Sequence, residues 1–192
     1  NLTNHVGRDQ RSSWSPDGQR IAFDSERDGN FDVYVMDAGG GNSQRITIHP
    51  EGDTNPLWSP DGSRIAFTSY RDGQAEIYAM DADGGNQVDL TNHPENDYGS
   101  AWSPDGGRIA FRRGDGPDGE IYVMDADGGN QTNLTNHPEA DLWPTWSPDG
   151  SRIAFWSRRD GNSEIYVMDA DGRNQTNLTK HPAADFRPDW SP

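Results

Sequence analysis

Apolar and polar positions alternate over short stretches of this chain, and the same alternation returns at a fixed interval. In its second copy the pattern predicts four strands, over residues 53–60, 63–69, 75–82 and 87–92. Turn sequences separate these strands: PDG at 60–62, RDG at 71–73 and DGG at 83–85. No stretch has the 3.6-residue spacing and the length of a helix. The sequence therefore predicts a repeated, antiparallel, four-stranded unit.

The interval identifies the kind of unit. Tryptophan recurs every 44 residues, and the repeats begin near Trp14, Trp58, Trp102 and Trp146. Residues 1–16 and 177–192 are further copies of one segment of the repeat. Four strands in roughly 40 to 45 residues are typical of a β-propeller blade. We therefore predict an all-β fold, a β-propeller of four-stranded antiparallel blades, with residues 1–192 as a single propeller domain or propeller segment.

The repeated phrase WSPDG is interpreted as scaffold. Trp58 and its equivalents are expected to wedge between neighbouring blades, and the apolar runs IAF and IYVM to pack blade against blade. The count of repeats leaves three forms of ring open. Four blades could close alone, two chains could form a homodimer with a larger ring, or the chain could belong to a longer propeller.

The phrases WSPDGxRIAF, RDG, IYVMDADGGN and LTNHP together resemble the TolB-type WD-like repeat of bacterial β-propellers, over the whole chain. The resemblance implies a propeller that binds partner proteins in the periplasm or outside the cell. It equally implies the non-catalytic propeller cap of prolyl-oligopeptidase-like peptidases. A G-x-S-x-G nucleophile elbow is absent from the sequence.

Charge narrows the class of partner. The formal net charge is −16, and the 16 basic residues are spread through the repeats. A nucleic acid is therefore not expected as a partner, whereas a basic partner, cation binding or a high-salt environment fits this balance. No apolar stretch approaches the length of a membrane span, so membrane insertion is not expected. The chain has no cysteine, which excludes disulfides.

The connections that vary between copies predict a recognition surface. The turns between the first and second and between the third and fourth strands are nearly identical in all copies, whereas the other two connections differ. Aromatic and arginine side chains dominate binding hot spots. The candidate binding residues on the divergent face are Tyr98, Trp143, Phe186, Arg187 and Trp156. The alternative is that these rings only pack the ends of adjacent blades.

Repeated carboxylates suggest cation sites. An aspartate opens the innermost strand of each copy, and these residues could direct oxygens at one calcium ion: Asp9, Asp53, Asp97, Asp141 and Asp185. A weaker D-x-D-G pattern contains Asp81, Asp83, Asp125, Asp127, Asp169 and Asp171. For the first set the alternative is a carboxylate that caps its own loop. In the second set the third acidic position and the closing glutamate of a calcium loop are missing. The chain is expected to require no cofactor, with calcium as a candidate ligand.

Two functions from different classes are compatible with these features. We expect a non-enzymatic scaffold that binds a protein or peptide on the divergent face. The alternative is a metal-dependent enzyme or binder of acidic sugars, since some propeller lyases hold a metal through histidines, and the chain repeats His49, His93, His137 and His181. A purely structural repeat array is a third alternative. Arg113 and Gly116 mark the third repeat as the most divergent, through either a loop variant or a specialised contact.

Overall fold

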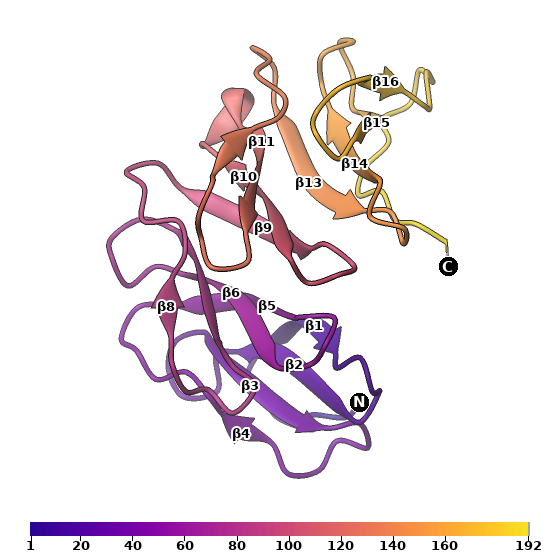
Figure 1. Cartoon of the computed structure of the whole chain (residues 1–192). Helices are drawn as coiled ribbons and strands as arrows, with labels where there is room; N and C mark the ends of the chain where they lie inside the picture. Colours follow the sequence, from indigo (N-terminus) through magenta and orange to yellow (C-terminus); the bar gives the residue numbers. More distant parts are fainter. Residues whose placement is uncertain (192) are drawn as a thin grey trace. The chain divides into compact units, whose positions relative to one another are not determined.

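The computed structural model describes residues 1–191, which divide into two compact units with a boundary between Pro94 and Glu95. Each unit contains two four-stranded antiparallel sheets whose strands follow one another in sequence order (Figure 1). The first unit holds the sheet β1 (Asp9–Trp14), β2 (Arg20–Ser25), β3 (Asp32–Asp37) and β4 (Gln44–Arg45), and the sheet β5 (Asp53–Trp58), β6 (Arg64–Ser69), β7 (Glu76–Asp81) and β8 (Val88–Asp89).

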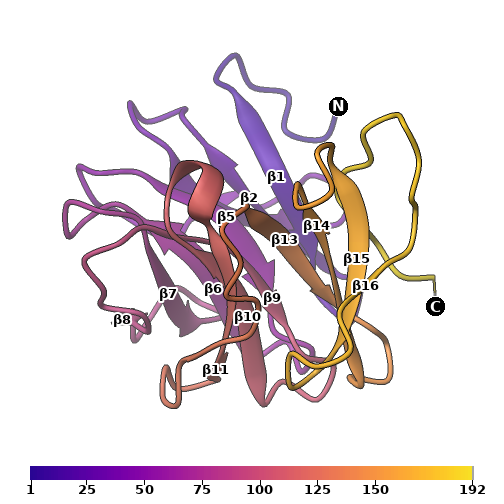
Figure 2. The ribbon, with the colours of Figure 1, turned by 90° about the horizontal axis from the view of Figure 1, so that it is seen from above.

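The second unit repeats this arrangement. Its sheets are β9 (Asp97–Trp102), β10 (Arg108–Arg113), β11 (Glu120–Asp125) and β12 (Thr132–Asn133), followed by β13 (Asp141–Trp146), β14 (Arg152–Ser157), β15 (Glu164–Asp169) and β16 (Thr176–Asn177). A short 3-10 helix, η1 (Gly116–Asp118), lies between β10 and β11 (Figure 2). This turn of helix was not predicted from the sequence. The chain as described contains no helix that is long and apolar enough to cross a membrane.

Within each unit the core lies between its two sheets. In the first unit Trp58 is buried together with Ala22 and Val33 of one sheet and Ile65 and Phe67 of the other. The second unit buries an equivalent set, again centred on a tryptophan: Ala110, Ile121, Trp146, Ile153 and Phe155. These clusters confirm the predicted wedge between neighbouring sheets, because neither apolar face is buried without the other.

An arginine caps each of these wedges. The Arg20 guanidinium lies 4.5 Å from the centre of the Trp58 ring, and the Arg108 guanidinium lies 4.7 Å from that of Trp146. Such cation–π contacts keep the charged end of a partly buried arginine in a favourable environment. Trp14, the first of the series, is instead 56% exposed.

The phrase WSPDG folds into a capped turn. In the second copy the Ser59 hydroxyl donates to the Asp61 carboxylate at 2.6 Å and accepts the Arg64 N–H at 3.0 Å. The same aspartate accepts the Ser63 N–H at 3.0 Å, and Gly62 has φ +70°, where a side chain would be strained. The serine–aspartate bond recurs at 2.6 Å in all four copies. The turn is therefore scaffold, as the sequence predicted.

The outer strands are shorter than the sequence predicted. A strand over residues 87–92 was expected, but β8 ends at Asp89. The Asp89 carboxylate accepts the N–H groups of Thr91 and Asn92, both at 3.0 Å, and Asn92 takes the left-handed φ of +40°. This side-chain-to-backbone turn competes with the ladder and ends the strand. Thr91 then turns inward, where its hydroxyl accepts the Ile77 N–H at 3.0 Å.

Candidate binding surface

The first strand of each sheet (β1, β5, β9 and β13) is the strand that we call innermost, and it carries a bulge near its start. In every sheet the pairing of this strand with the next one shifts register after its second residue. The residue after this shift takes a left-handed φ between +48° and +64°, and the segment after β16 does the same: Arg11, Asn55, Gly99, Trp143 and Arg187. Glycine and asparagine adopt this conformation readily, whereas arginine and tryptophan do so at a cost.

The bulge groups three variable positions in each copy. The second residue of the innermost strand pairs with the fifth residue of the next strand, as in Gln10 with Asp24 and Thr54 with Thr68. In the second unit the same pairs are Tyr98 with Arg112 and Leu142 with Trp156. Together with the bulge residue, these positions differ among the four sheets, whereas the neighbouring residues of the second strand, RIAF, are the same in all four. The variation therefore lies on a shared scaffold.

In the second unit most of the variable positions are aromatic or cationic. The Arg187 guanidinium lies 5.2 Å from the Trp143 ring centre, and the Phe186 ring meets the Trp156 ring edge-on at 5.2 Å. Trp143 and Phe186 are 42% and 54% exposed, whereas Trp156 is buried. We call these four side chains the aromatic cluster. The structure thus brings four of the five predicted binding residues together in two contacting pairs, one a cation–π contact and one an edge-on ring contact.

The fifth predicted residue, Tyr98, lies in a separate pair. The Arg112 guanidinium is 5.6 Å from the Tyr98 ring centre, and the Tyr98 hydroxyl donates to Asp115 at 3.1 Å. Burial lowers the pKa of Arg112, and the nearby charges of Asp115 and Asp118 offset only part of that effect. Arg112 was not predicted as a binding residue. Arg112 could have been found by aligning the copies and then pairing the first two strands of each, because Arg112 faces Tyr98 across the ladder.

Buried donors near these rings lack partners. Trp156 Nε1 and Arg112 Nε are both buried, and neither makes a hydrogen bond within residues 1–191. Buried polar groups are nearly always satisfied in folded proteins, so such donors are candidates for contacts with a ligand acceptor. The arrangement therefore offers exposed aromatic area, with two unpartnered N–H groups buried close to it.

The segment after β16 supplies half of the aromatic cluster. The Asp185 N–H donates to the Ser163 carbonyl at 2.7 Å, just as the Asp141 N–H donates to the Gly119 carbonyl at 2.7 Å. Trp190 Nε1 donates to the Thr145 carbonyl at 3.2 Å. The segment after β16 thus contacts the sheet β13–β16 in the same way as β13 contacts the sheet β9–β12. That placement brings Phe186 and Arg187 onto Trp156 and Trp143.

Four of the five aspartates that were predicted to direct oxygens at one calcium ion make ion pairs with arginines. Asp53 pairs with Arg71 at 3.0 Å, Asp97 with Arg113 at 2.7 Å, and Asp141 with Arg159 at 2.5 Å. Asp9 pairs with Arg27 at 3.0 Å. In Asp141, burial raises the pKa above its ordinary value although Ser157 and Arg159 oppose the shift. In each of these ion pairs the arginine supplies the positive charge that a calcium ion would supply.

The other predicted calcium ligands belong to turns. Asp81 accepts the Asn86 side-chain amide at 2.6 Å, and Asp83 accepts the Gly85 N–H at 3.0 Å. The equivalents Asp125, Asp127, Asp169 and Asp171 make matching bonds. Over the described residues, no group of three or more metal-ligating side chains is arranged to hold an ion. Calcium binding stays a prediction.

The repeated histidines close the connection before each innermost strand. His137 Nδ1 accepts the Glu139 N–H at 3.1 Å, and His49 and His181 make the same bond two residues ahead at 3.2 Å and 3.1 Å. The backbone N–H of His137 donates to Glu120 at the start of β11. These contacts give the histidines a local structural role.

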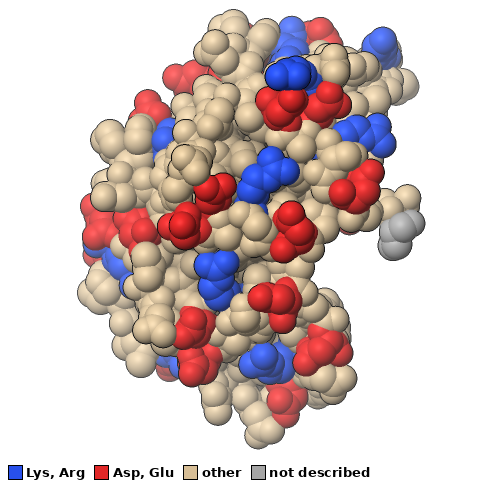
Figure 3. All heavy atoms as spheres, in the orientation of Figure 1, with Lys and Arg blue, Asp and Glu red and all other residues tan. Residues whose placement is uncertain are grey.

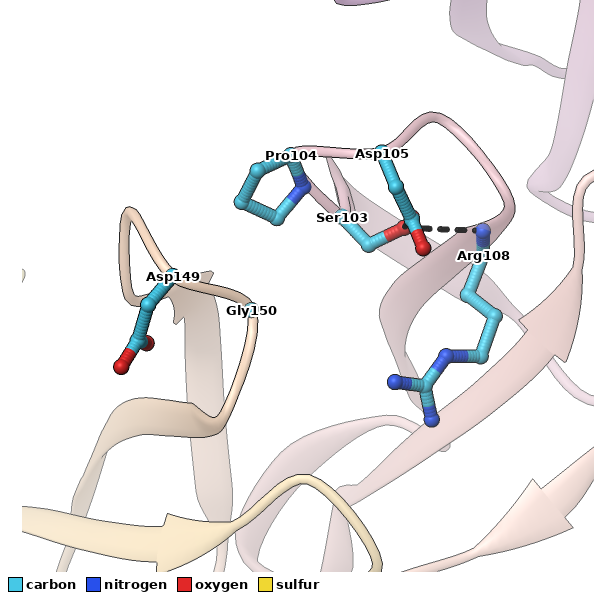
Figure 4. A pocket seen from close by; sticks show the side chains of 6 residues that line it. All are labelled: Ser103, Pro104, Asp105, Arg108, Asp149 and Gly150. Carbon is cyan, nitrogen blue, oxygen red and sulfur yellow. Dashed lines mark hydrogen bonds between the residues drawn. The ribbon is translucent and has the colours of Figure 1, made fainter.

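A shallow cavity opens between two WSPDG turns of the second unit. It has a volume of about 330 Å³ and is lined by Ser103, Pro104, Asp105, Arg108, Asp149 and Gly150 (Figure 4). Its residues are those that every copy shares. In the first unit, a Cβ placed on Gly62 would likewise lie 3.5 Å from Pro16 Cδ. The cavity therefore results from the packing of successive turns and carries no feature unique to one copy.

The surface charge is mixed at short range. Acidic and basic side chains alternate over the face seen in Figure 3. This distribution agrees with arginines that recur in every repeat within an acidic chain.

A family comparison identifies the repeat. The model of the TolB beta propeller domain matches residues 1–116 and residues 90–192. The chain belongs to the TolB β-propeller family. The predicted TolB-type resemblance is therefore confirmed, and with it the assignment of each four-stranded sheet as a propeller blade.

Two solved TolB structures are similar to this TolB-family chain. A protein described as TolB from Agrobacterium tumefaciens is 28% identical, with a TM-score of 0.85 over 100% of this chain and 69% of that one. TolB from Acinetobacter baumannii is 30% identical, with a TM-score of 0.80 over 92% of this chain and 44% of that one. These likenesses confirm the predicted all-β propeller fold. The present chain spans only part of either relative.

The blades of this chain also resemble those of proteins with unrelated activities. An oligogalacturonate lyase in complex with manganese is 17% identical, with a TM-score of 0.71 over 89% of this chain and 52% of that one. At this identity the likeness shows the fold alone. Function must therefore be inferred from the positions that vary between the TolB-type copies.

Proposed function

We propose that this TolB-family chain is a non-enzymatic scaffold that binds a protein or peptide segment through its aromatic cluster. The observation that carries the proposal is Trp143, which is 42% exposed and takes φ +55° at the bulge of β13. A partly exposed tryptophan in a conformation that disfavours it costs backbone strain, and a role in recognition explains its presence.

The neighbours of Trp143 support this role. Arg187 stacks on it at 5.2 Å, and Phe186 extends the exposed apolar area over the buried Trp156. Tryptophan and arginine are the residue types most enriched at energetic centres of interfaces. The variable positions contain no histidine, cysteine or serine, which disfavours covalent catalysis at this surface.

Family and charge indicate the setting. Membership of the TolB β-propeller family supports a location in the periplasm or outside the cell. The net charge of −16 disfavours nucleic acid as the partner. The partner is therefore a polypeptide met in an extracytoplasmic compartment.

The test is selection of peptides from a random display library against the whole chain, followed by measurement of their affinities by calorimetry. Trp143→Gly removes the ring and suits the left-handed backbone, as Gly99 does in the preceding copy. We expect this variant to fold and to bind selected peptides about tenfold or more weakly, as expected for a hot-spot residue.

Leu178→Ala is the matched control, because it removes an apolar side chain that is 57% exposed and lies outside the aromatic cluster. We expect it to retain full affinity. Equal affinities for the chain, Trp143→Gly and Leu178→Ala would exclude the aromatic cluster as the binding site.

A further inference from the structure

Asp24 is a buried carboxylate at a position where the blade does not need one. It is the fifth residue of β2 and is 0% exposed. The equivalent positions hold Thr68, Arg112 and Trp156. Since three other sheets form around entirely different side chains, the acid is not part of the repeated scaffold. Asp24 lies in the first unit, so a role for it in binding is independent of the aromatic cluster.

The hydrogen bonding of Asp24 is incomplete. Its Oδ2 atom accepts the Gln10 side-chain amide at 3.1 Å and the Arg11 guanidinium at 3.5 Å. Its Oδ1 atom is buried and has no hydrogen-bond partner in the part of the chain that the structure describes. Burial raises the pKa of Asp24, and the Gln10 amide, the Arg11 guanidinium and the Asn55 backbone N–H oppose that shift only in part. A buried carboxylate normally has donors on both oxygens.

Arg11 covers this carboxylate loosely. Its side chain is 47% exposed, it reaches Asp24 through one nitrogen at 3.5 Å, and its backbone takes the left-handed φ of +48°. The scaffold pair Arg113–Asp97 shows the contrast, with two bonds of 2.9 Å and 2.7 Å and both side chains buried. The contact of Arg11 with Asp24 is therefore weaker than the Arg113–Asp97 pair, and another guanidinium group can replace Arg11.

We propose that Asp24 is a binding site for a guanidinium group, such as an arginine side chain of a basic peptide, and that Arg11 is the internal group that this ligand replaces. A guanidinium matches a carboxylate because its two parallel N–H groups reach both oxygens, including the unpartnered Oδ1. The net charge of −16 attracts such a ligand over a distance. A metal ion would need more oxygen ligands than Asp24 and Gln10 supply.

The probe that tests this site is N-acetyl-arginine amide, titrated into the whole chain at constant ionic strength. Binding is followed by NMR chemical shifts of the backbone amides around Gln10 and Asp24. We expect saturable shifts with this probe and none with N-acetyl-citrulline amide, a neutral molecule of the same shape. Asp24→Asn should weaken binding about tenfold, the effect of one charge-assisted hydrogen bond. Glu51→Gln, which removes the same charge at an exposed position, should leave it unchanged.

Arg11→Gly provides a second, opposite test. Glycine suits the left-handed backbone, and the substitution removes the group that competes with the probe. We expect the variant to bind N-acetyl-arginine amide about fivefold or more tightly than the unmodified chain, because the resident contact no longer has to be broken. Equal shifts from the arginine and citrulline probes, or no gain in affinity in Arg11→Gly, would overturn the proposal. Trp143→Gly should leave this binding intact, which separates its outcome from that of the aromatic cluster.

Discussion

Single residues set both the turns and the variable surface of this chain. Asp61 and its equivalents fix the turn after each innermost strand by accepting a serine hydroxyl and a backbone N–H. The bulge residues act differently, because their left-handed backbone tolerates arginine and tryptophan only at a cost. The turn aspartates are the same in all four copies, whereas the bulge residues vary. This contrast separates side chains that build the blade from side chains available for recognition.

The turn aspartates predict a defined pH dependence. Hydrogen bonds from Ser59 and Ser63 lower the pKa of Asp61 to about 2, below its ordinary value of 3.8. A lowered pKa in the folded state stabilises the protein above pH 3.8, and this contribution is lost as the pH falls towards 2. We expect Asp61→Ala to lower the free energy of unfolding at pH 7 and to match the unmodified chain near pH 2. Urea titrations at several pH values measure this, and a difference independent of pH would contradict it.

At the scale of elements, the third sheet shows how one blade compensates for a changed sequence. Arg71 and Arg159 follow their strands by two residues and pair with Asp53 and Asp141. In the third sheet Arg113 ends β10 itself, yet it pairs with Asp97 and lies over the Phe111 and Tyr122 rings at 5.4 Å and 4.8 Å. The guanidinium thus fills the same role from a different sequence position. The divergence of this repeat is in that respect structural.

This compensation predicts a large cost for one substitution. Arg113→Ala would leave the fully buried Asp97 without its bidentate partner, so we expect a loss of about 3 kcal/mol in the free energy of unfolding. The double variant with Asp97→Ala should lose less than the sum of the single losses. Arg173→Ala is the control, because its pair with Asp171 is exposed, and its cost should stay within about 0.5 kcal/mol. Additive losses in chemical denaturation would argue against a coupled pair.

At the scale of the whole molecule, burial of the repeated tryptophans distinguishes the copies. Trp58 and Trp146 are buried between the two sheets of their units. Trp14 occupies the equivalent place on the sheet β1–β4 and is 56% exposed. The same residue in the same local turn therefore contributes differently, because its burial depends on whether a neighbouring blade covers it.

We expect Trp146→Ala to cost about 3–5 kcal/mol in the free energy of unfolding, the range for a buried aromatic side chain. Trp14→Ala should cost less than about 1 kcal/mol, since its ring loses little burial. Denaturation followed by circular dichroism measures both losses. Equal costs would mean that another blade covers Trp14 in solution, as it would in a homodimer, and light scattering of both variants would then show whether that blade belongs to a second copy.

Much of the fold could be predicted because each repeat shows the same alternation of apolar and polar residues and the same turn sequences. Alternation located three of the four strands to within about two residues, and the shared turns located their ends. The outer strand was overestimated because Asp89 forms a side-chain turn where β-propensity alone would continue the ladder. Four predicted binding residues proved to be neighbours, but Arg112 and Asp24 were missed, since only the register across two strands shows what they face.

The sequence by itself determined the blade: its four strands, its WSPDG turn, its tryptophan wedge and its membership of the TolB β-propeller family. These are local or periodic properties, and the sequence repeats them four times with a period of 44 residues. The tertiary structure alone decided that the repeated carboxylates pair with arginines, that Trp143 meets Arg187, and that Asp24 is buried with one oxygen unpartnered. Such contacts join residues 18 or more positions apart or across a ladder, where burial and register, rather than local pattern, set the partner.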